Sequence, residues 1–526
     1  MGNLFNSVQI KTPSSNTFDL SYDHKMSMRM GNLVPFHVQE CVPGDSFSIR
    51  TEAMLRVAPL LAPIMHKVDV YMHYFFVPNR ILWDDWETFI TGGQKPDDSP
   101  AFPTLNFNSV ALGQINIVPS SLPNYLGLPV VPDMGSVSAL PFAAYQKIWY
   151  EFYRDQNLQE TEFPVLREGE QTSDVFIALT QMQQRAWAHD YFTSALPFAQ
   201  KGESVDIPIS FEGVDFDVVL KDVADRTNIP IWRDAITNLP TSSSDFIGTG
   251  FSGETRNVGG DILFPDLGDY YKATGNGSGN VDSTINDLRT AYALQRWLEK
   301  NARAGTRYTE SILAHFGVRS SDKRLQRPEY MGGSKQALVI SEVLQTSSPE
   351  TDHETPLGTM AGHGISVGST GNVKYRCEEH GYIIGLMSIL PRTAYFQGLP
   401  KHFSKFDRMQ YFWPDFANLG EQEILNKELY YSQSDGLNND VFGYTPRYAE
   451  YKFNMSRVSG DFATTLDYWH MARKFGNRPR LNEEFIVSDP TKRIFAVTDP
   501  TEDDVYIHTY SNIMARRPMP KYGTPI

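Results

Sequence analysis

Four short motifs of this chain carry residue types that can do chemistry. Gly364–Gly368 (GISVG) matches G-x-S-x-G, the turn that exposes a nucleophilic serine in α/β hydrolases. That turn needs a strand before the serine and a helix after it, whereas glycines surround this segment and the next run, Asn372–Cys377, is strand-like. Gly332–Lys335 (GGSK) lacks the full G-x-x-x-x-G-K pattern of a phosphate-binding loop. We therefore expect neither a catalytic serine nor a nucleotide loop.

The other two motifs could hold a metal ion. Cys377–His380 (CEEH) offers a thiolate, two carboxylates and an imidazole, but zinc needs a second pair of ligands, and the only other cysteine is Cys41. On a strand the four side chains would also point to opposite faces. His24–Met30 (HKMSMRM) could attract a soft metal, although alternating methionines on an extended segment favour packing. We expect no metal, no cofactor and no enzyme activity.

Basic residues that could bind phosphate collect near the C-terminus. Four of them lie within eight residues, and after Asp504 the chain has no acid, only further cations interleaved with Pro518, Pro520 and Tyr522. The prolines predict a basic extended arm over 505–526 rather than a helix. Such arms suit a nucleic-acid backbone, since cations release counterions and tyrosine stacks on bases. A solvated or subunit-clasping tail is the alternative.

The negative charge is concentrated in one segment. The chain of 526 residues carries −15, and residues 203–288 hold fifteen acids against five bases, which leaves only −5 for the remainder. The same segment is rich in glycine and serine, as in Gly275–Gly279 (GNGSG), a composition typical of exposed loops. We predict an insertion with a small fold of its own; a linker between two domains is the alternative.

Composition excludes several classes of protein. Hydrophobic residues make up 41% and aromatic residues 13% of the chain, too much for a disordered protein. No run reaches the ~18 continuous apolar residues of a membrane-spanning helix, and the first residues lack a secretory pattern. Two cysteines cannot form a disulfide framework, so we expect reduced thiols. We expect no membrane insertion.

Periodicity indicates a mainly β chain with a few helices. Ser46–Leu55 alternates apolar and polar residues, as a half-buried strand does. Further strands are predicted at Val68–Val77, Ala337–Gln345, Gly381–Leu390, Tyr448–Met455, Ile494–Val497 and Val505–Tyr510. Helices are predicted at Asn79–Ile90, at Phe142–Arg154, and as a pair over Ile285–Phe316 with a break at Ala304–Thr306. So few helices cannot cover a parallel sheet, which favours a β-sandwich with long insertions.

Several segments resemble the major capsid proteins of microviruses, the gokushovirus branch in particular. The strongest is Tyr74–Trp86 (YFFVPNRILWDDW), supported by Phe142–Arg154 (FAAYQKIWYEFYR), Ile383–Gly398 (IIGLMSILPRTAYFQG) and Phe403–Phe416 (FSKFDRMQYFWPDF). With Val8–Tyr22, Tyr191–Gly202, Tyr448–Phe475 and the C-terminal ARRPMPKYGTP, the resemblance follows nearly the whole chain in order. The acidic segment is the exception.

This resemblance implies a structural subunit. Its fold would be a single eight-stranded antiparallel jelly roll with long inserted loops, formed by residues 1–202 and 289–526. Its copies would assemble as a T=1 icosahedral shell around circular single-stranded DNA. Residues 203–288 would form a protrusion at the threefold axis that mediates host attachment. Implied partners are a small basic internal DNA-binding protein, a pilot protein and a bacterial surface receptor, and the implied location is the virion, assembled in the host cytoplasm.

Two sets of residues follow as candidates. Those expected to face DNA are Arg473, Lys474, Arg478, Arg480, Arg516, Arg517 and Lys521. Those expected to contact the host are Thr241, Ser244, Phe246, Phe251, Asn276 and Ser278. Two other functions stay open at this point: a phage receptor-binding protein and a carbohydrate-active β-sandwich enzyme. Closed particles, a small oligomer or catalytic turnover would distinguish the three.

Overall fold

The computed structural model describes most of the chain. It covers residues 14–522 except 94, 96–98, 109–115, 133, 204, 206–210, 213–215, 221–270, 276–279, 282–283, 306, 345–359, 435 and 500. The chain divides into two compact units, one formed by Met1–Lys201 with Leu298–Ile526 and the other by Gly202–Trp297. The predicted insertion, 203–288, falls inside the second unit. The six predicted host-contact residues lie outside the described residues.

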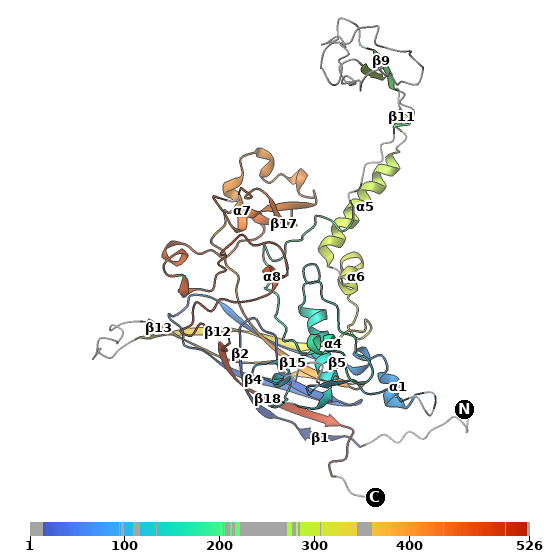
Figure 1. Cartoon of the computed structure of the whole chain (residues 1–526), viewed down its shortest axis with the longest axis vertical. Coiled ribbons are helices and arrows are strands. Elements are labelled where there is room, and N and C mark those ends of the chain that lie inside the picture. The colour runs from blue at the N-terminus through green and yellow to red at the C-terminus, as the bar shows by residue number, and fades with distance from the viewer. Residues whose placement is uncertain are drawn as a thin grey trace, which may run out of the picture. The chain divides into compact units, whose positions relative to one another are not determined.

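The first unit is built on two antiparallel sheets (Figure 1). Their strands are β2 (Tyr22–Met28), β18 (Val505–Arg517), β4 (Ser46–Val57) and β13 (Met360–Ser369) in one, and β3 (Val34–Cys41), β15 (Gly381–Pro391), β5 (Val68–Pro78) and β12 (Glu329–Leu344) in the other. Strands β12 and β13 also pair with each other, which joins the sheets at one edge. Short strands β1 (Asn16–Asp19) and β14 (Val373–Arg376) extend the first sheet along β18 and β4.

Chain order alternates between the sheets in the way a jelly roll requires. Successive strands β2, β3, β4 and β5 fall in the first, second, first and second sheet, and β12, β13, β15 and β18 in the second, first, second and first. The predicted mainly β fold, an eight-stranded jelly roll with inserted loops and a few helices, is confirmed. Side chains from both sheets form one core between them, among them Ile49 and Ile513 from the first and Val70 and Ile383 from the second.

The two sheets differ in what covers their outer faces. Strand β4 alternates buried and less buried residues, whereas β5 is almost wholly buried. The reason is a layer of helices and loops that packs on β5 and β15 through a second apolar cluster. Within it, the Tyr145 hydroxyl donates to the Leu33 carbonyl over 2.7 Å, which fixes helix α3 (Leu140–Ile148) to the sheet. The remaining helices of this layer are α1 (Trp86–Thr91), α2 (Leu122–Tyr125) and α4 (Ser173–Thr180).

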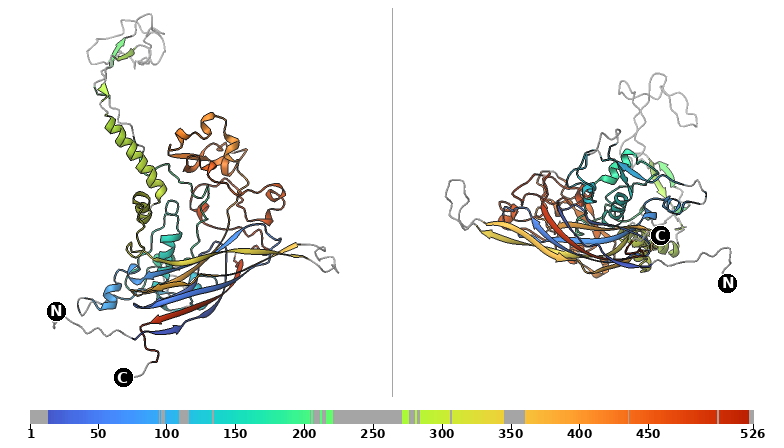
Figure 2. Two further views of the ribbon diagram at one scale, coloured as in Figure 1. Left: turned by 180° about the vertical axis from the view of Figure 1, so that it is seen from behind. Right: turned by 90° about the horizontal axis from the view of Figure 1, so that it is seen from below.

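A third cluster holds the long loops together. It joins Phe192 and Tyr395 with Phe442 and Phe485, around strands β16 (Glu421–Leu425) and β17 (Val441–Pro446) and helices α7 (Asn426–Leu429) and α8 (Glu483–Ile486). A short strand pair, β6 (Thr104–Asn106) with β7 (Ser136–Ser138), also belongs to this unit. Figure 2 shows these loops and helices on one side of the strands in a second view. Among the described residues, no helix is long and apolar enough to cross a membrane.

Most predicted elements are present. The predicted pair of helices is α5 (Ile285–Ala304) and α6 (Tyr308–Phe316), with the break where it was expected. Two predicted strands were wrong. Residues 448–455 form a short 3-10 turn, Ala449–Tyr451, and residues 494–497 make one isolated bridge, Leu60 with Phe495. Both segments lie in loops whose apolar side chains pack individually on neighbouring clusters, so their alternation does not mark a sheet.

The second unit contains two small strand pairs. Strand β9 (Phe216–Leu220) pairs with β10 (Tyr271–Gly275), and β8 (Phe211–Glu212) pairs with β11 (Asn280–Val281). Each pair joins residues from the two ends of the acidic segment. These strands lie within residues 203–288, for which the sequence predicts a small fold of its own.

The buried His37 between the sheets makes the fold sensitive to acid. Burial and the nearby His24 lower the pKa of His37 from 6.5 to about 4, and its ring contacts those of Tyr22 and Tyr74. Between these pH values the unfolded chain binds a proton that the folded chain rejects, so stability is complete above pH 6.5 and falls toward pH 4. From pH 7 to pH 5 we expect His37 to cost about 2 kcal/mol of unfolding free energy.

Urea unfolding of the unassembled subunit at both pH values measures this loss. The His37→Gln variant should show a flatter dependence on pH than the unsubstituted chain. If that variant does not fold, His73→Gln serves instead, because burial and Arg185 lower the pKa of His73 to about 4 as well. Identical pH dependence in the variant and the unsubstituted chain would contradict this account.

Candidate nucleic-acid interface

Strand β18 presents a regular outward face. Its residues alternate strictly, so that odd-numbered side chains from Val505 to Ala515 are buried in the core and even-numbered ones point away from it. The outward side chains are Tyr506, His508, Tyr510, Asn512, Met514 and Arg516. Tyr506 is 50% exposed and Tyr510 is 42% exposed, so the described residues leave much of this side of the strand open to solvent.

Neighbouring strands continue the same face in register. Tyr506 lies beside Arg56 of β4, and Arg516 lies beside Ser46, which in turn pairs with Arg376 of β14. We call the outward side of β1, β2, β4, β13, β14 and β18 the open sheet face. Its charged side chains are Asp19, Asp23, Lys25, Arg50, Glu52, Arg56, Lys374, Arg376 and Arg516.

The open sheet face is electropositive. Six of its side chains are cationic and three are acidic. Glu52 pairs with Arg50 at 3.3 Å, and Asp23 lies 2.9 Å from the ring of His508. Within the described part of the chain, the other five cations make no ion pair with a carboxylate. Exposed cations beside exposed tyrosines are what a nucleic-acid backbone and its unstacked bases require.

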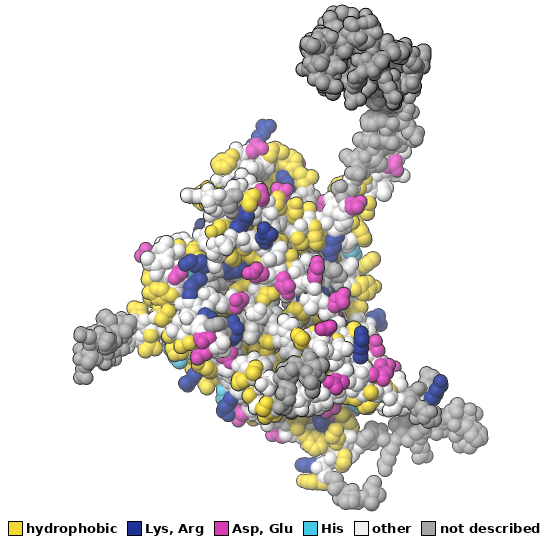
Figure 3. Space-filling model, in the orientation of Figure 1, with side chains coloured by type: hydrophobic (Ala, Val, Ile, Leu, Met, Phe, Trp, Pro, Cys, Tyr) yellow, Lys and Arg dark blue, Asp and Glu magenta, His cyan; other side chains and the backbone are white. Residues whose placement is uncertain are grey.

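Four of the predicted DNA-facing residues lie elsewhere, in the loops. The guanidinium of Arg473 stacks on the Phe485 ring at 4.1 Å and donates to the Phe485 carbonyl, so it holds two loops together. Lys474 makes a 2.6 Å ion pair with Asp467. Arg478 is half-buried, and Arg480 is exposed. On the side of the molecule seen in Figure 3, basic and acidic side chains are interspersed.

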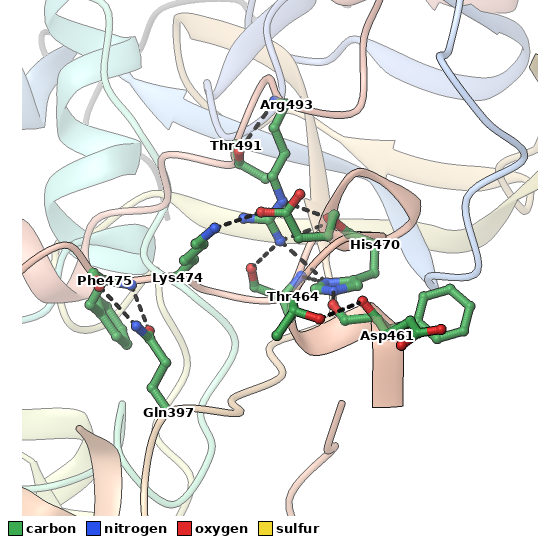
Figure 4. Close-up of polar contacts among 11 residues, drawn as sticks. Gln397, Asp461, Thr464, His470, Lys474, Phe475, Thr491 and Arg493 are labelled. Carbon is green, nitrogen blue, oxygen red and sulfur yellow. Dashed lines mark hydrogen bonds and ion pairs between the residues drawn. The ribbon is translucent and has the colours of Figure 1, made fainter. Parts of the chain in front are cut away.

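A polar network around Arg493 stabilises the conformation of the loop that carries Arg473 and Lys474. Arg493 donates to three backbone carbonyls, those of Asp467, His470 and Ala472, at 2.7–3.1 Å (Figure 4). In the same view, Gln397 exchanges two hydrogen bonds with the backbone of Phe475. Most of these interactions satisfy backbone groups that the loop would otherwise leave unpaired. The local density of cations here therefore serves the fold.

The C-terminal arm needs correction. Residues 505–517 of the predicted arm are strand β18, which contains the predicted strand Val505–Tyr510 and is paired along both edges; the prolines begin only at Pro518, after the strand. Adjacent residues of this strand consequently differ. Arg516 points outward, whereas Arg517 pairs at 3.3 Å with Asp45, which is fully buried, and also donates to the Glu40 carbonyl. Lys521, beyond the strand, is exposed.

The residues of the motifs that could do chemistry make structural contacts instead. The G-x-S-x-G segment lies within strand β13, where the Ser366 hydroxyl donates to the Ala337 carbonyl and is buried. Glu378 and Glu379 form ion pairs with Lys323 and Arg80. Cys41 and Cys377 are both free and buried. Among the described residues, no group of three His, Cys, Asp or Glu side chains could hold a metal ion.

Comparison with known proteins identifies the family. A family model described as capsid protein (F protein) matches residues 7–526. The chain is 36% identical to capsid protein VP1 of Chlamydia phage 1, across 100% of this chain and 98% of that protein. The chain belongs to this capsid protein family. It is also 34% identical to VP1 of Bdellovibrio phage phiMH2K (97% of this chain, 94% of that protein) and 29% identical to VP1 of Spiroplasma virus 4 (95% and 93%).

Family membership confirms the predicted resemblance to microvirus capsid proteins. This capsid protein is a structural subunit of a phage shell and not an enzyme, and its place is the virion. The open sheet face combines exposed tyrosines with cations that make no ion pair among the described residues, and this makes it the candidate surface for contact with nucleic acid. Sequence reasoning missed Lys25, Arg56, Lys374 and Arg376, although Arg50 already stood on the polar side of a predicted strand.

Arg516 and Arg517 provide a matched test of these assignments. Arg517→Ala leaves the buried carboxylate of Asp45 without its cation, and we expect a loss of about 3–5 kcal/mol in unfolding free energy. Arg516→Ala removes an exposed side chain and should change stability by less than about 0.5 kcal/mol. Chemical denaturation of the unassembled subunits measures both. Equal losses of stability in the two variants would contradict the assignment of Arg517 to a buried ion pair and of Arg516 to the exposed face.

Proposed function

We propose that this capsid protein assembles into a T=1 icosahedral shell around circular single-stranded DNA, with the open sheet face lining the interior. The observation that supports this orientation is the difference between the two sheets. Helices and loops bury the outer side of β5 and β15, whereas β4 and β18 present exposed cations and tyrosines. A genome offers phosphates that these cations lack within the subunit.

The net charge of the subunit supports the participation of other proteins in neutralising the packaged DNA. Each subunit carries −15 overall, and the cations of the open sheet face are few compared with the phosphates of a packaged genome. We propose that a small basic internal protein supplies much of the remaining neutralisation, and that a pilot protein accompanies the DNA. Assembly would take place in the cytoplasm of the host bacterium.

We also propose that residues 203–288 form the threefold protrusion and mediate attachment to a receptor on the host. Two observations support a separate role for this segment. It carries two-thirds of the excess negative charge, and it falls within a compact unit distinct from the one that contains the jelly roll. Thr241, Ser244, Phe246, Phe251, Asn276 and Ser278 are the proposed contact residues.

Neutralising the open sheet face should reduce the DNA content of shells. We expect particles of the Arg56→Gln, Lys374→Gln, Arg376→Gln, Arg516→Gln variant to form but to contain less DNA, because four phosphate-binding cations are lost from every subunit. The ratio of absorbance at 260 and 280 nm of purified particles measures the content. Salt dependence of single-stranded DNA binding should also fall, by about 0.7 in slope for each cation.

A double variant of the loop residues, Lys474→Gln with Arg480→Gln, is the matched control. Both side chains are exposed, but neither lies on the open sheet face, so particles of this variant should keep their full DNA content. Loss of DNA in the control, with normal content in the fourfold variant, would assign DNA binding to the loops instead.

Deleting Thr241–Gly279 separates attachment from assembly. We expect particles of the usual size, seen by electron microscopy, that no longer adsorb to host cells in a sedimentation assay. The physical reason is that the jelly roll has its own core, formed without this segment. Failure of the deleted chain to assemble would instead make the segment part of the shell contacts.

A further inference from the structure

A cavity opens on the open sheet face at the end nearest β2. Its volume is about 620 Å³, and its lining comes from β2, β4, β18 and the segment that leads into helix α2. The polar side chains of its lining include Lys25, Arg56, Asn124, Tyr506 and His508. Nothing in the function proposed above requires a cavity, because a flat basic surface already binds phosphates.

Strand register places the two strongest cations on opposite sides of the cavity. Tyr506 lies between Arg56 of β4 and Ser27 of β2, and His508 lies between Met54 of β4 and Lys25 of β2. Arg56 and Lys25 are thus two strands and two residues apart, about 12 Å between Cα atoms from ordinary sheet spacings. Their long side chains can reach groups on either side of a ligand that rests on Tyr506.

The acids near the cavity are already engaged. No carboxylate belongs to the described lining. Asp23 lies 2.9 Å from the His508 ring, and Asp503 accepts hydrogen bonds from the hydroxyls of Ser27 and Ser120. The lysine and arginine of the lining, Lys25 and Arg56, make no ion pair with a carboxylate among the described residues, which leaves both for an anionic ligand.

The strands form the floor of the cavity, and residues 119–125 form its wall. These two parts offer different contacts. The exposed ring of Tyr506 on the floor can stack on a flat ligand. In the wall, Asn124 donates to the Leu128 carbonyl over 3.1 Å, which fixes its amide while leaving its oxygen as an acceptor. Tyr125 donates to the Ser27 carbonyl over 2.7 Å, which holds the wall against β2. The cavity is consequently held in shape before any ligand binds.

The geometry points to a binding site for one unstacked nucleotide of single-stranded DNA, its base on Tyr506 and its flanking phosphates on Arg56 and Lys25. This inference rests on the proposed inward orientation of the open sheet face and deepens it. A nucleotide brings both the flat ring and the two anionic groups that the cavity can accept. Duplex DNA keeps its bases stacked within the helix, so it can offer the cavity only phosphates.

Binding of labelled oligonucleotides to the full-length capsid protein tests the site. The probes are a twelve-residue oligothymidylate, the matching duplex, and inorganic tripolyphosphate as a competitor with charge but no base. We expect tighter binding of the single strand than of the duplex, and weak competition by tripolyphosphate. Tyr506→Ala should weaken single-strand binding about tenfold, a typical effect of removing one stacking ring, whereas Tyr506→Phe should stay within about twofold.

Tyr510→Ala is the matched control, since Tyr510 is an exposed tyrosine on the same face of β18 but outside the cavity lining. Photocrosslinking with a 5-iodouracil oligonucleotide, followed by mass spectrometry, should mark Tyr506. Equal losses in Tyr506→Ala and Tyr510→Ala, or a crosslink elsewhere, would overturn the nucleotide site. Equal binding of duplex and single strand would do the same.

These outcomes can be told apart from a failure of the proposed function. If binding is unchanged in Tyr506→Ala but lost in the fourfold variant of Arg56, Lys374, Arg376 and Arg516, the cavity is not the site and the inward face stands. If the unsubstituted protein forms shells yet binds no oligonucleotide of either kind, both proposals fall. Arg56→Gln alone should reduce binding while leaving the Tyr506 crosslink in place.

Discussion

The packing of alternate side chains of β4 and β18 into the space between the sheets is the interaction on which the rest of the subunit depends. Because strand side chains alternate, burying Ile507 and Ile513 obliges Tyr506 and Arg516 to point out. The same constraint acts on β4, where Leu55 is buried and Arg56 is exposed. A core-forming pattern on one side thus fixes which side chains are exposed on the other.

The asymmetry between the sheets gives the subunit two different faces. One sheet lies between the jelly-roll core and an aromatic layer of helices and loops, so its strands are apolar on both sides. The other sheet has a single buried side and stays polar on its exposed side. One side of the sandwich thus carries the inserted helices and loops, while the strands of the other side keep an exposed face.

Arginines that occur in similar basic clusters of the sequence make different contacts in the structure. Arg473 and Arg493 satisfy carbonyls and stack on rings within the loops, and Arg517 neutralises a buried carboxylate. Arg376 and Arg516 do neither, and they lie in one row of the sheet, on either side of Ser46. The position of a cation along the chain therefore says less about the surface it joins than the pairing of strands does.

The sequence by itself determined the β class, the strands at Ser46–Val57 and Gly381–Pro391, the pair of helices and the absence of a convincing catalytic motif, since these depend on local periodicity and spacing. It also carried the family resemblance. Only the tertiary structure decided which cations share a face, because strand pairing joins residues hundreds of positions apart, as with Ser46 and Arg516. It likewise decided that the strand predicted at Val505–Tyr510 continues to Arg517, since its partners, β2 and β4, lie near the other end of the chain.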